Sequence, residues 1–150
     1  MAQSGDWWGN VFKGEYHYGL DDKGRVVLPP KFRRALGAVV VVTRGLDECV
    51  FIYSPQEWAR FEKKLRALSI NKRDLVRFLL ASAEDVDVDR QGRMTLPAHL
   101  RRYAKIEREA VVVGVINRLE VWGKEHWLSY IGRAQTKTAR LAAQMDELSI

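Results

Sequence analysis

The chain has 150 residues, of which 47% are hydrophobic and 29% charged, and its net charge is +6. This composition is typical of a soluble globular protein with one domain or two small ones. A single cysteine, Cys49, excludes an intramolecular disulfide framework and fits a reducing compartment, and its strand-like flanks predict a buried structural thiol.

The sequence also limits where the protein is located and what it binds. No apolar run is long enough to cross a bilayer, and residues 1–10 lack the charged-then-apolar profile of a signal peptide. We therefore expect a cytoplasmic protein without a membrane partner. The excess of Lys and Arg is compatible with a polyanionic partner but does not establish one.

The first predicted feature along the chain is a polar turn at residues 21–25, with strand-like residues on both sides. The Asp21 carboxylate is suited to accept nearby backbone N–H groups. Gly24 is expected to adopt a backbone conformation that is costly for other residues. A short basic helix is predicted at residues 30–36, because a proline at its first position favours a helix start and Gly37 can end it.

Strands and a helical pair complete this first half. Valine-rich or apolar segments at residues 39–43 and 50–53 predict two strands. Ser54 then caps a helix, with proline and glutamate at the expected positions after it. Asn71 is predicted to cap a second helix. Trp58 lies at helical spacing with later apolar residues, which indicates core packing between helix and sheet.

The second half repeats the first. Residues 21–34 recur at residues 89–102, an offset of 68 residues, with seven identities in fourteen positions. The identical pairs are Asp21 and Asp89, Gly24 and Gly92, Arg25 and Arg93, Leu28 and Leu96, Pro29 and Pro97, Arg33 and Arg101, and Arg34 and Arg102. A short helix at 98–104, strands at 110–115 and 119–122, and a second helical pair with Trp127 follow.

Each half therefore reads β-β-(short helix)-β-β followed by a helical pair. A unit of ~65–70 residues has a marginal core on its own, so we expect the halves to pack against each other. The predicted boundaries are 13–58 for the first copy and 59–82 for a helical connection. The second copy is predicted at 83–127 and a C-terminal helical segment at 128–150.

The turn and the short helix carry most of the candidate binding residues. A hairpin edge with several cations suits phosphate contact and base readout in the major groove of DNA. The candidate side chains are Lys23, Arg25, Lys31, Arg33, Arg34, Arg93, Arg101 and Arg102. In the alternative interpretation, Asp21 and Arg25 form an internal ion pair that fixes the turn, as do the equivalent residues of the second copy. The ion-pair and DNA-contact interpretations are both correct if the aspartate carboxylate orients an arginine that still reaches DNA.

Charge separates the two copies. Residues 13–44 contain seven cations and three acids, net +4, whereas residues 81–112 contain six of each, net 0. Acidic side chains at Asp85, Asp87 and Asp89 would repel phosphates, so we expect the first copy to make most of the DNA contacts. These three carboxylates share one strand face. A calcium loop needs a turn-rich arrangement, so a solvated strand face is favoured and no metal site is predicted.

Catalysis is not expected. His17, His99 and His126 occur singly, without the spacing of zinc ligands. No glycine-rich phosphate loop is present, and Cys49 lies in an apolar run that disfavours an activated thiolate. We therefore predict no cofactor and no small-molecule substrate.

Several motifs together resemble one known family. Phe-Lys-Gly-Glu at residues 12–15, the two Asp-x-x-x-Arg motifs and both Gly-Arg-x-x-Leu-Pro runs are similar to the MraZ family. More broadly they resemble the AbrB/SpoVT superfamily of swapped-hairpin DNA-binding barrels. The resemblance covers roughly residues 12–148. It implies an α+β, mainly β fold, in which two tandem pseudo-symmetric AbrB-type units form a β-barrel with flanking helical pairs.

The resemblance also implies a function. MraZ proteins are bacterial transcriptional regulators that bind promoter direct repeats of the division and cell-wall gene cluster, typically repressing it, as ring-shaped homo-oligomers. It implies that Arg25 and Arg93 carry the motif, with Asp21 and Asp89 as partners, in a cytoplasmic, nucleoid-associated protein. An AbrB- or antitoxin-like global regulator and a ring-forming structural protein remain alternatives. Two copies per chain favour MraZ over the former, which usually has one.

One departure from the family pattern is the segment before Phe12. Members usually start close to that position, whereas this chain has eleven residues there, including Trp7 and Trp8. Disorder and contact with a neighbouring subunit are both open for this segment.

Overall fold

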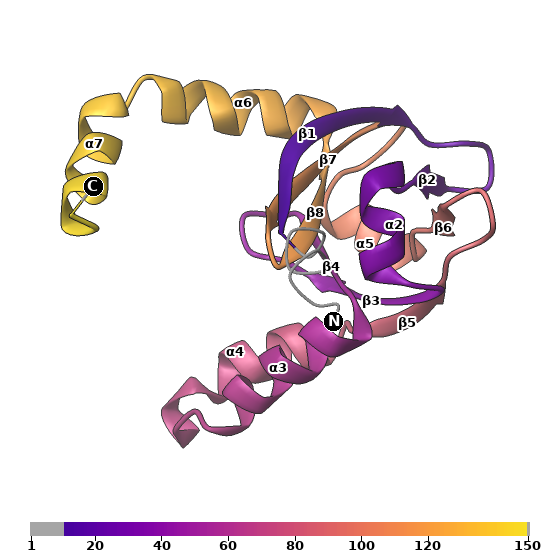
Figure 1. The fold of residues 1–150 in the computed structure, drawn as a ribbon, viewed down its shortest axis with the longest axis horizontal. Helices are drawn as coiled ribbons and strands as arrows, with labels where there is room; N and C mark the ends of the chain where they lie inside the picture. Colours follow the sequence, from indigo (N-terminus) through magenta and orange to yellow (C-terminus); the bar gives the residue numbers. More distant parts are fainter. Residues whose placement is uncertain (1–10, 150) are drawn as a thin grey trace, which may run out of the picture.

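A computed structural model describes residues 11–149, so the segment with Trp7 and Trp8 lies outside the described residues. The strands are β1 (Phe12–Gly19), β2 (Arg25–Val27), β3 (Val39–Arg44), β4 (Val50–Tyr53), β5 (Glu84–Asp87), β6 (Arg93–Thr95), β7 (Glu109–Ile116) and β8 (Arg118–Gly123) (Figure 1). The helices are α2 (Pro30–Leu36), α3 (Pro55–Arg66), η1 (Ile70–Lys72), α4 (Arg73–Leu80), α5 (Ala98–Tyr103), α6 (Lys124–Gln135) and α7 (Thr138–Glu147).

The two copies of the repeat are interlocked strand by strand. The larger sheet has the order β1-β7-β8-β4-β3-β5, and β2 and β6 form a separate two-stranded sheet. Thus β1 of the first copy pairs with β7 of the second, and β5 of the second copy pairs with β3 of the first. The two central strands, β8 and β4, also join the copies. Neither copy keeps these hydrogen-bonding partners without the other.

The prediction of a mainly β fold with two repeats and added helices is confirmed, but closure into a barrel is not. The six-stranded sheet has two edges, β1 and β5, and the β2–β6 sheet is not hydrogen-bonded to it as a strand neighbour. The described residues therefore form an open sheet with a short two-stranded sheet beside it.

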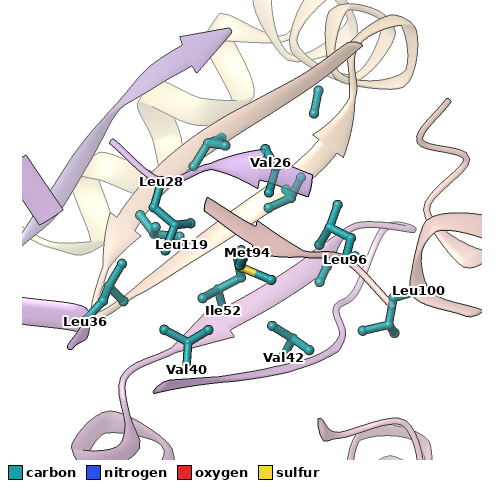
Figure 2. Close-up of a cluster of buried hydrophobic side chains, with 14 of the residues drawn as sticks. Val26, Leu28, Leu36, Val40, Val42, Ile52, Met94, Leu96, Leu100 and Leu119 are labelled. Atoms are coloured by element: carbon teal, nitrogen blue, oxygen red, sulfur yellow. The ribbon is translucent and has the colours of Figure 1, made fainter. Parts of the chain in front are cut away.

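The main core lies between these two sheets. Figure 2 shows Val26 and Leu28 meeting Met94 and Leu96 above Ile52 of the large sheet. Both motif leucines are fully buried. Burial of a leucine side chain stabilises a fold by about 1.5–3 kcal/mol. The Leu-Pro sequence of each motif therefore contributes to a core that the two copies share.

A second apolar cluster covers the outer face of the large sheet. Trp58 of α3 packs on Tyr53 at 5.7 Å between ring centroids, and Trp127 of α6 packs on Trp122 at 5.1 Å. Cys49 is buried in this cluster, and burial raises the pKa of its thiol. The predicted core role of Trp58 and the predicted buried thiol are confirmed, and Trp127, the equivalent residue of the second copy, packs in the same cluster.

One helix start follows its prediction and another does not. The Ser54 hydroxyl accepts the backbone N–H of Glu57 at 3.2 Å, as predicted for an N-cap. The prediction that Asn71 caps the next helix is wrong, because Asn71 lies inside the 3₁₀ turn η1 and α4 begins at Arg73. The Asn71 side-chain oxygen instead accepts the hydroxyl of Ser69.

The helical pairs lie outside the sheets. In Figure 1, α3 and α4 form a hairpin that projects from one end of the molecule, and α6 leads to α7 at another. Among residues 11–149, none of the helices combines the length and apolarity that a membrane span requires. These helices lie away from β2 and β6, the two strands that the repeated turns lead into (Figure 1).

Candidate nucleic-acid interface

The first turn is fixed by one carboxylate. Asp21 Oδ1 accepts the backbone N–H groups of Lys23 and Arg25, each at 2.9 Å, and Asp21 Oδ2 accepts Arg25 Nε at 2.6 Å. Gly24 has φ +73°, a left-handed conformation that favours glycine. The internal ion pair is therefore present, and it holds the guanidinium of Arg25 at the turn.

The second turn repeats this geometry. Asp89 Oδ1 accepts the N–H groups of Gln91 and Arg93 at 2.9 Å, and Asp89 Oδ2 accepts Arg93 Nε at 2.8 Å. Gly92 has φ +79°. The two turns thus share one backbone geometry, and they differ in the side chains at two positions, Asp22 and Lys23 against Arg90 and Gln91, and in their surroundings.

Each ion pair leaves its arginine available for a further contact. The bond to aspartate uses Nε, and within residues 11–149 the terminal NH groups of Arg25 and Arg93 make no hydrogen bond. The side chains of Arg25 and Arg93 are 26% and 33% exposed to solvent, respectively. An arginine oriented through Nε can still donate its terminal groups to a phosphate or a guanine edge. The structural and DNA-contacting interpretations are compatible.

The turns lead directly into a two-stranded ribbon with two distinct faces. Arg25 lies opposite Thr95 and Val27 lies opposite Arg93 in the β2–β6 register. Side chains alternate along a strand, and the residues between them, Val26 and Met94, are buried in the core. The outward face therefore carries two arginines, offset diagonally across the ribbon. A two-stranded ribbon of this kind fits the major groove of B-DNA.

The remaining predicted cations divide into two groups. Lys23, Lys31, Arg34 and Arg102 are exposed. Lys31 Nζ lies 5.6 Å from the Tyr16 ring centroid. In contrast, Arg33 and Arg101 are half-buried, and each donates Nε to a backbone carbonyl oxygen. The structure thus places four of these cations at the surface and commits two to internal contacts.

The surroundings of the two turns differ in charge. The edge strand β5 exposes Glu84, Asp85 and Asp87 near the second turn. His99, at the position equivalent to Lys31, pairs with Glu84. Within residues 11–149 there is no group of three or more His, Cys, Asp or Glu side chains placed to hold a metal ion. The acidic strand therefore remains a source of negative potential beside the second copy.

The sequence reasoning did not single out a second basic surface, which lies on the helical hairpin of α3, η1 and α4. Residues 60–77 contain seven Lys or Arg and two Asp or Glu. The tip is also apolar, since Ile70 is 80% exposed. A charge count over this window would have found it. This surface, which we call the basic hairpin, projects away from the ribbon (Figure 1).

The lowered pKa values of the motif aspartates predict an acid-dependent loosening of the turns. The pKa of Asp21 is lowered chiefly by the hydrogen bond from the backbone N–H of Arg25, and the Arg25 guanidinium lowers it further. Arg93 lowers the pKa of Asp89 in the same way. Since the folded-state pKa lies below the unfolded value of about 3.9, this stabilisation is present above that pH. It is lost as pH falls through the folded-state value.

NMR titration of the side-chain carboxyl carbons measures this directly. Both aspartates should titrate below their midpoints in the unfolded chain, and an Arg25→Ala variant should move the midpoint of Asp21 upward without moving that of Asp89. Midpoints at or above the unfolded value would contradict the hydrogen-bonding pattern of the turns.

Comparison with known families assigns the chain to one of them. The family model described as "MraZ protein, putative antitoxin-like" matches residues 11–78 and, a second time, residues 79–148. The chain belongs to the MraZ family. Each match to the MraZ model takes in one copy of the turn motif together with its helical pair. The finer boundaries at 13–58, 59–82, 83–127 and 128–150 stay predictions.

Individual MraZ relatives match nearly the whole chain. The chain is 43% identical over 143 residues to a protein of Halothermothrix orenii named "Transcriptional regulator MraZ", which covers 93% of this chain and 100% of that protein. The same name, coverage and identity apply to a protein of Moorella thermoacetica. A protein of Acetivibrio thermocellus with this name is 44% identical over 143 residues.

Proposed function

We propose that this MraZ-family chain is a sequence-specific DNA-binding transcriptional regulator, not an enzyme, and that it reads DNA with the outward face of the β2–β6 ribbon. The observation that carries the proposal is the pair of oriented arginines, Arg25 and Arg93, on a ribbon whose other face is buried. The names of the relatives support the same class of function.

The exposed cations beside the ribbon supply the contacts that position it. Lys23, Lys31 and Arg34 of the first copy and Arg102 of the second contact phosphates, which fix orientation but carry no sequence information directly. The first copy contributes more of this attraction, because its window has a net charge of +4 against 0 for the second. Arg25 is therefore the principal base-reading residue.

The regulatory unit in this proposal is a ring-shaped homo-oligomer bound to direct repeats. Its targets lie in the promoter of the division and cell-wall gene cluster, which it represses from the cytoplasm as a nucleoid-associated protein. Support comes from the family resemblance and from the exposed apolar side chains of α6, α7 and the residue after α7, namely Leu128, Leu141, Met145 and Leu148. A ring engages several repeats at once, which raises the effective concentration of each later contact.

A gel-shift assay with DNA from upstream of this protein's own gene tests the proposal. Specific binding should exceed binding to random DNA by orders of magnitude and should weaken steeply as salt rises, because phosphate contacts release counterions. Scrambling one repeat should reduce affinity more than proportionally. Equal affinity for all DNA would favour an antitoxin-like global regulator, and no binding at moderate salt would favour a structural assembly protein.

A further inference from the structure

Each glycine turn of the interface is anchored by the opposite copy of the repeat. Leu28 of the first copy donates its backbone N–H to the carbonyl oxygen of Gly92 at 2.8 Å. Leu96 of the second copy donates its N–H to the carbonyl oxygen of Gly24 at 3.0 Å. Because these leucines directly precede Pro29 and Pro97, the N-cap residues of α2 and α5, each turn is tied to the start of the other copy's short helix.

Two arginines extend this crossed arrangement. Arg33 Nε donates to the carbonyl oxygen of Leu28 at 3.1 Å, and Arg101 makes the equivalent bond in the second copy at 3.2 Å. Their guanidinium groups then lie against the opposite turns. A Cβ atom added to Gly24 would lie 2.9 Å from Arg101 Cζ, and one added to Gly92 would overlap Arg33. A side chain at either position would therefore displace the neighbouring guanidinium group, and the positive φ favours glycine there in any case.

The neighbouring arginines behave differently. Arg34 and Arg102 are exposed. Among the hydrogen bonds and ion pairs of residues 11–149, none involves their side chains. In each Arg-Arg pair, the first residue is therefore committed to the protein and the second remains open to solvent or phosphate. The second arginines serve as matched controls for the first.

We infer that Arg33 and Arg101 are positioning residues for DNA recognition, each fixing the turn of the opposite copy. Arg101 packs against Gly24 and thereby sets the position of Arg25. Arg33 packs against Gly92 and thereby sets the position of Arg93. The inference rests on the proposed function, since it takes the ribbon as the DNA-reading element. One consequence is that the first turn, in the window of net charge +4 (residues 13–44), depends on an arginine from the window of net charge 0 (residues 81–112).

Amide hydrogen exchange tests the crossed anchoring without DNA. In Arg101→Ala, the backbone N–H of Arg25 should exchange about tenfold faster, because the turn that holds its bond to Asp21 loses its support. The N–H of Arg93 should keep its rate, and Arg33→Ala should give the reverse pattern. Arg34→Ala and Arg102→Ala should change neither rate. The inference is overturned if each variant loosens the turn of its own copy, or if both turns respond equally.

DNA affinity then separates positioning from direct contact. Arg101→Ala should weaken binding to the promoter repeats about tenfold, and Arg101→Lys should weaken it as much, since lysine keeps the charge but lacks the Nε donor. The Arg25→Ala/Arg101→Ala double variant should bind no more weakly than Arg25→Ala alone. Recovery of affinity with lysine, or additive losses, would overturn the inference in favour of a direct phosphate contact.

The two arms distinguish the possible failures. If the arginine variants do not change amide exchange in the turn of the opposite copy, the positioning role is refuted, whatever the DNA-binding results are. Crossed exchange together with DNA binding that is insensitive to Arg25→Ala refutes the DNA-reading role of the ribbon instead. If an alanine variant does not fold, the lysine variant supplies both readouts, because it retains the packing of the side-chain stem.

Discussion

Replacing Arg25 by alanine is expected to weaken binding to repeat-bearing promoter DNA by about 10- to 100-fold, the loss associated with one bidentate base contact. The equivalent Arg93→Ala change is expected to cost about threefold or less. The two arginines have the same local geometry, with Nε bonded to aspartate at 2.6 and 2.8 Å. A difference is expected because the acidic strand β5 leads directly into the second turn and opposes approach of a phosphate backbone there.

Fluorescence anisotropy at one fixed salt concentration measures both affinities, with circular dichroism as the check on folding. Lys64→Ala in the basic hairpin is a matched control, since it removes one exposed cation at a distance from the ribbon and should leave affinity nearly unchanged. Equal losses for Arg25→Ala and Arg93→Ala, with folding intact, would show that the charge difference between the copies does not govern binding.

The second large effect concerns the shared core. Leu28→Ala should lower the free energy of unfolding by about 2–5 kcal/mol, the usual cost of truncating a fully buried leucine. Leu96→Ala should cost a similar amount, because both side chains are 0% exposed and pack in the same cluster. Since strands are exchanged between the copies, each variant should still unfold in a single transition in urea.

Leu46→Ala serves as the control for this prediction, because that side chain is 53% exposed and surface changes usually stay within about 0.5 kcal/mol. Two separate unfolding transitions, each altered by one of the core variants, would mean that the copies fold independently. That result would contradict the interlocked sheet.

Local features of this fold could be predicted because their signals are local. The Asp-x-x-x-Arg turn, its glycine and the Ser54 cap each depend on contacts within a few residues. Asn71 failed as a cap because a single 3₁₀ turn moved the start of the next helix to Arg73. Tertiary packing determines where this helix begins, and the pattern of residue types within the helix does not indicate that position.

The resemblance to swapped-hairpin proteins implied an exchange of strands between the copies, but the residues alone did not predict which strands pair. The repeat predicts two similar units, but β1 carries no signal that selects β7 of the other copy over β3 of its own. The same limit applies to the Arg-Arg pairs. Arg33 and Arg34 are chemically identical neighbours, and only the structure shows that one packs on the opposite turn while the other is exposed.

In the proposed mode of binding, the ribbon and its turns read DNA, and the first copy makes most of the contacts. Hydrogen exchange followed by mass spectrometry, with and without promoter DNA, tests this most directly. We expect the strongest protection in residues 21–34, weaker protection in residues 89–102 and none attributable to DNA in residues 60–77. Protection centred on the basic hairpin at residues 60–77, with the two turns unchanged, would contradict it.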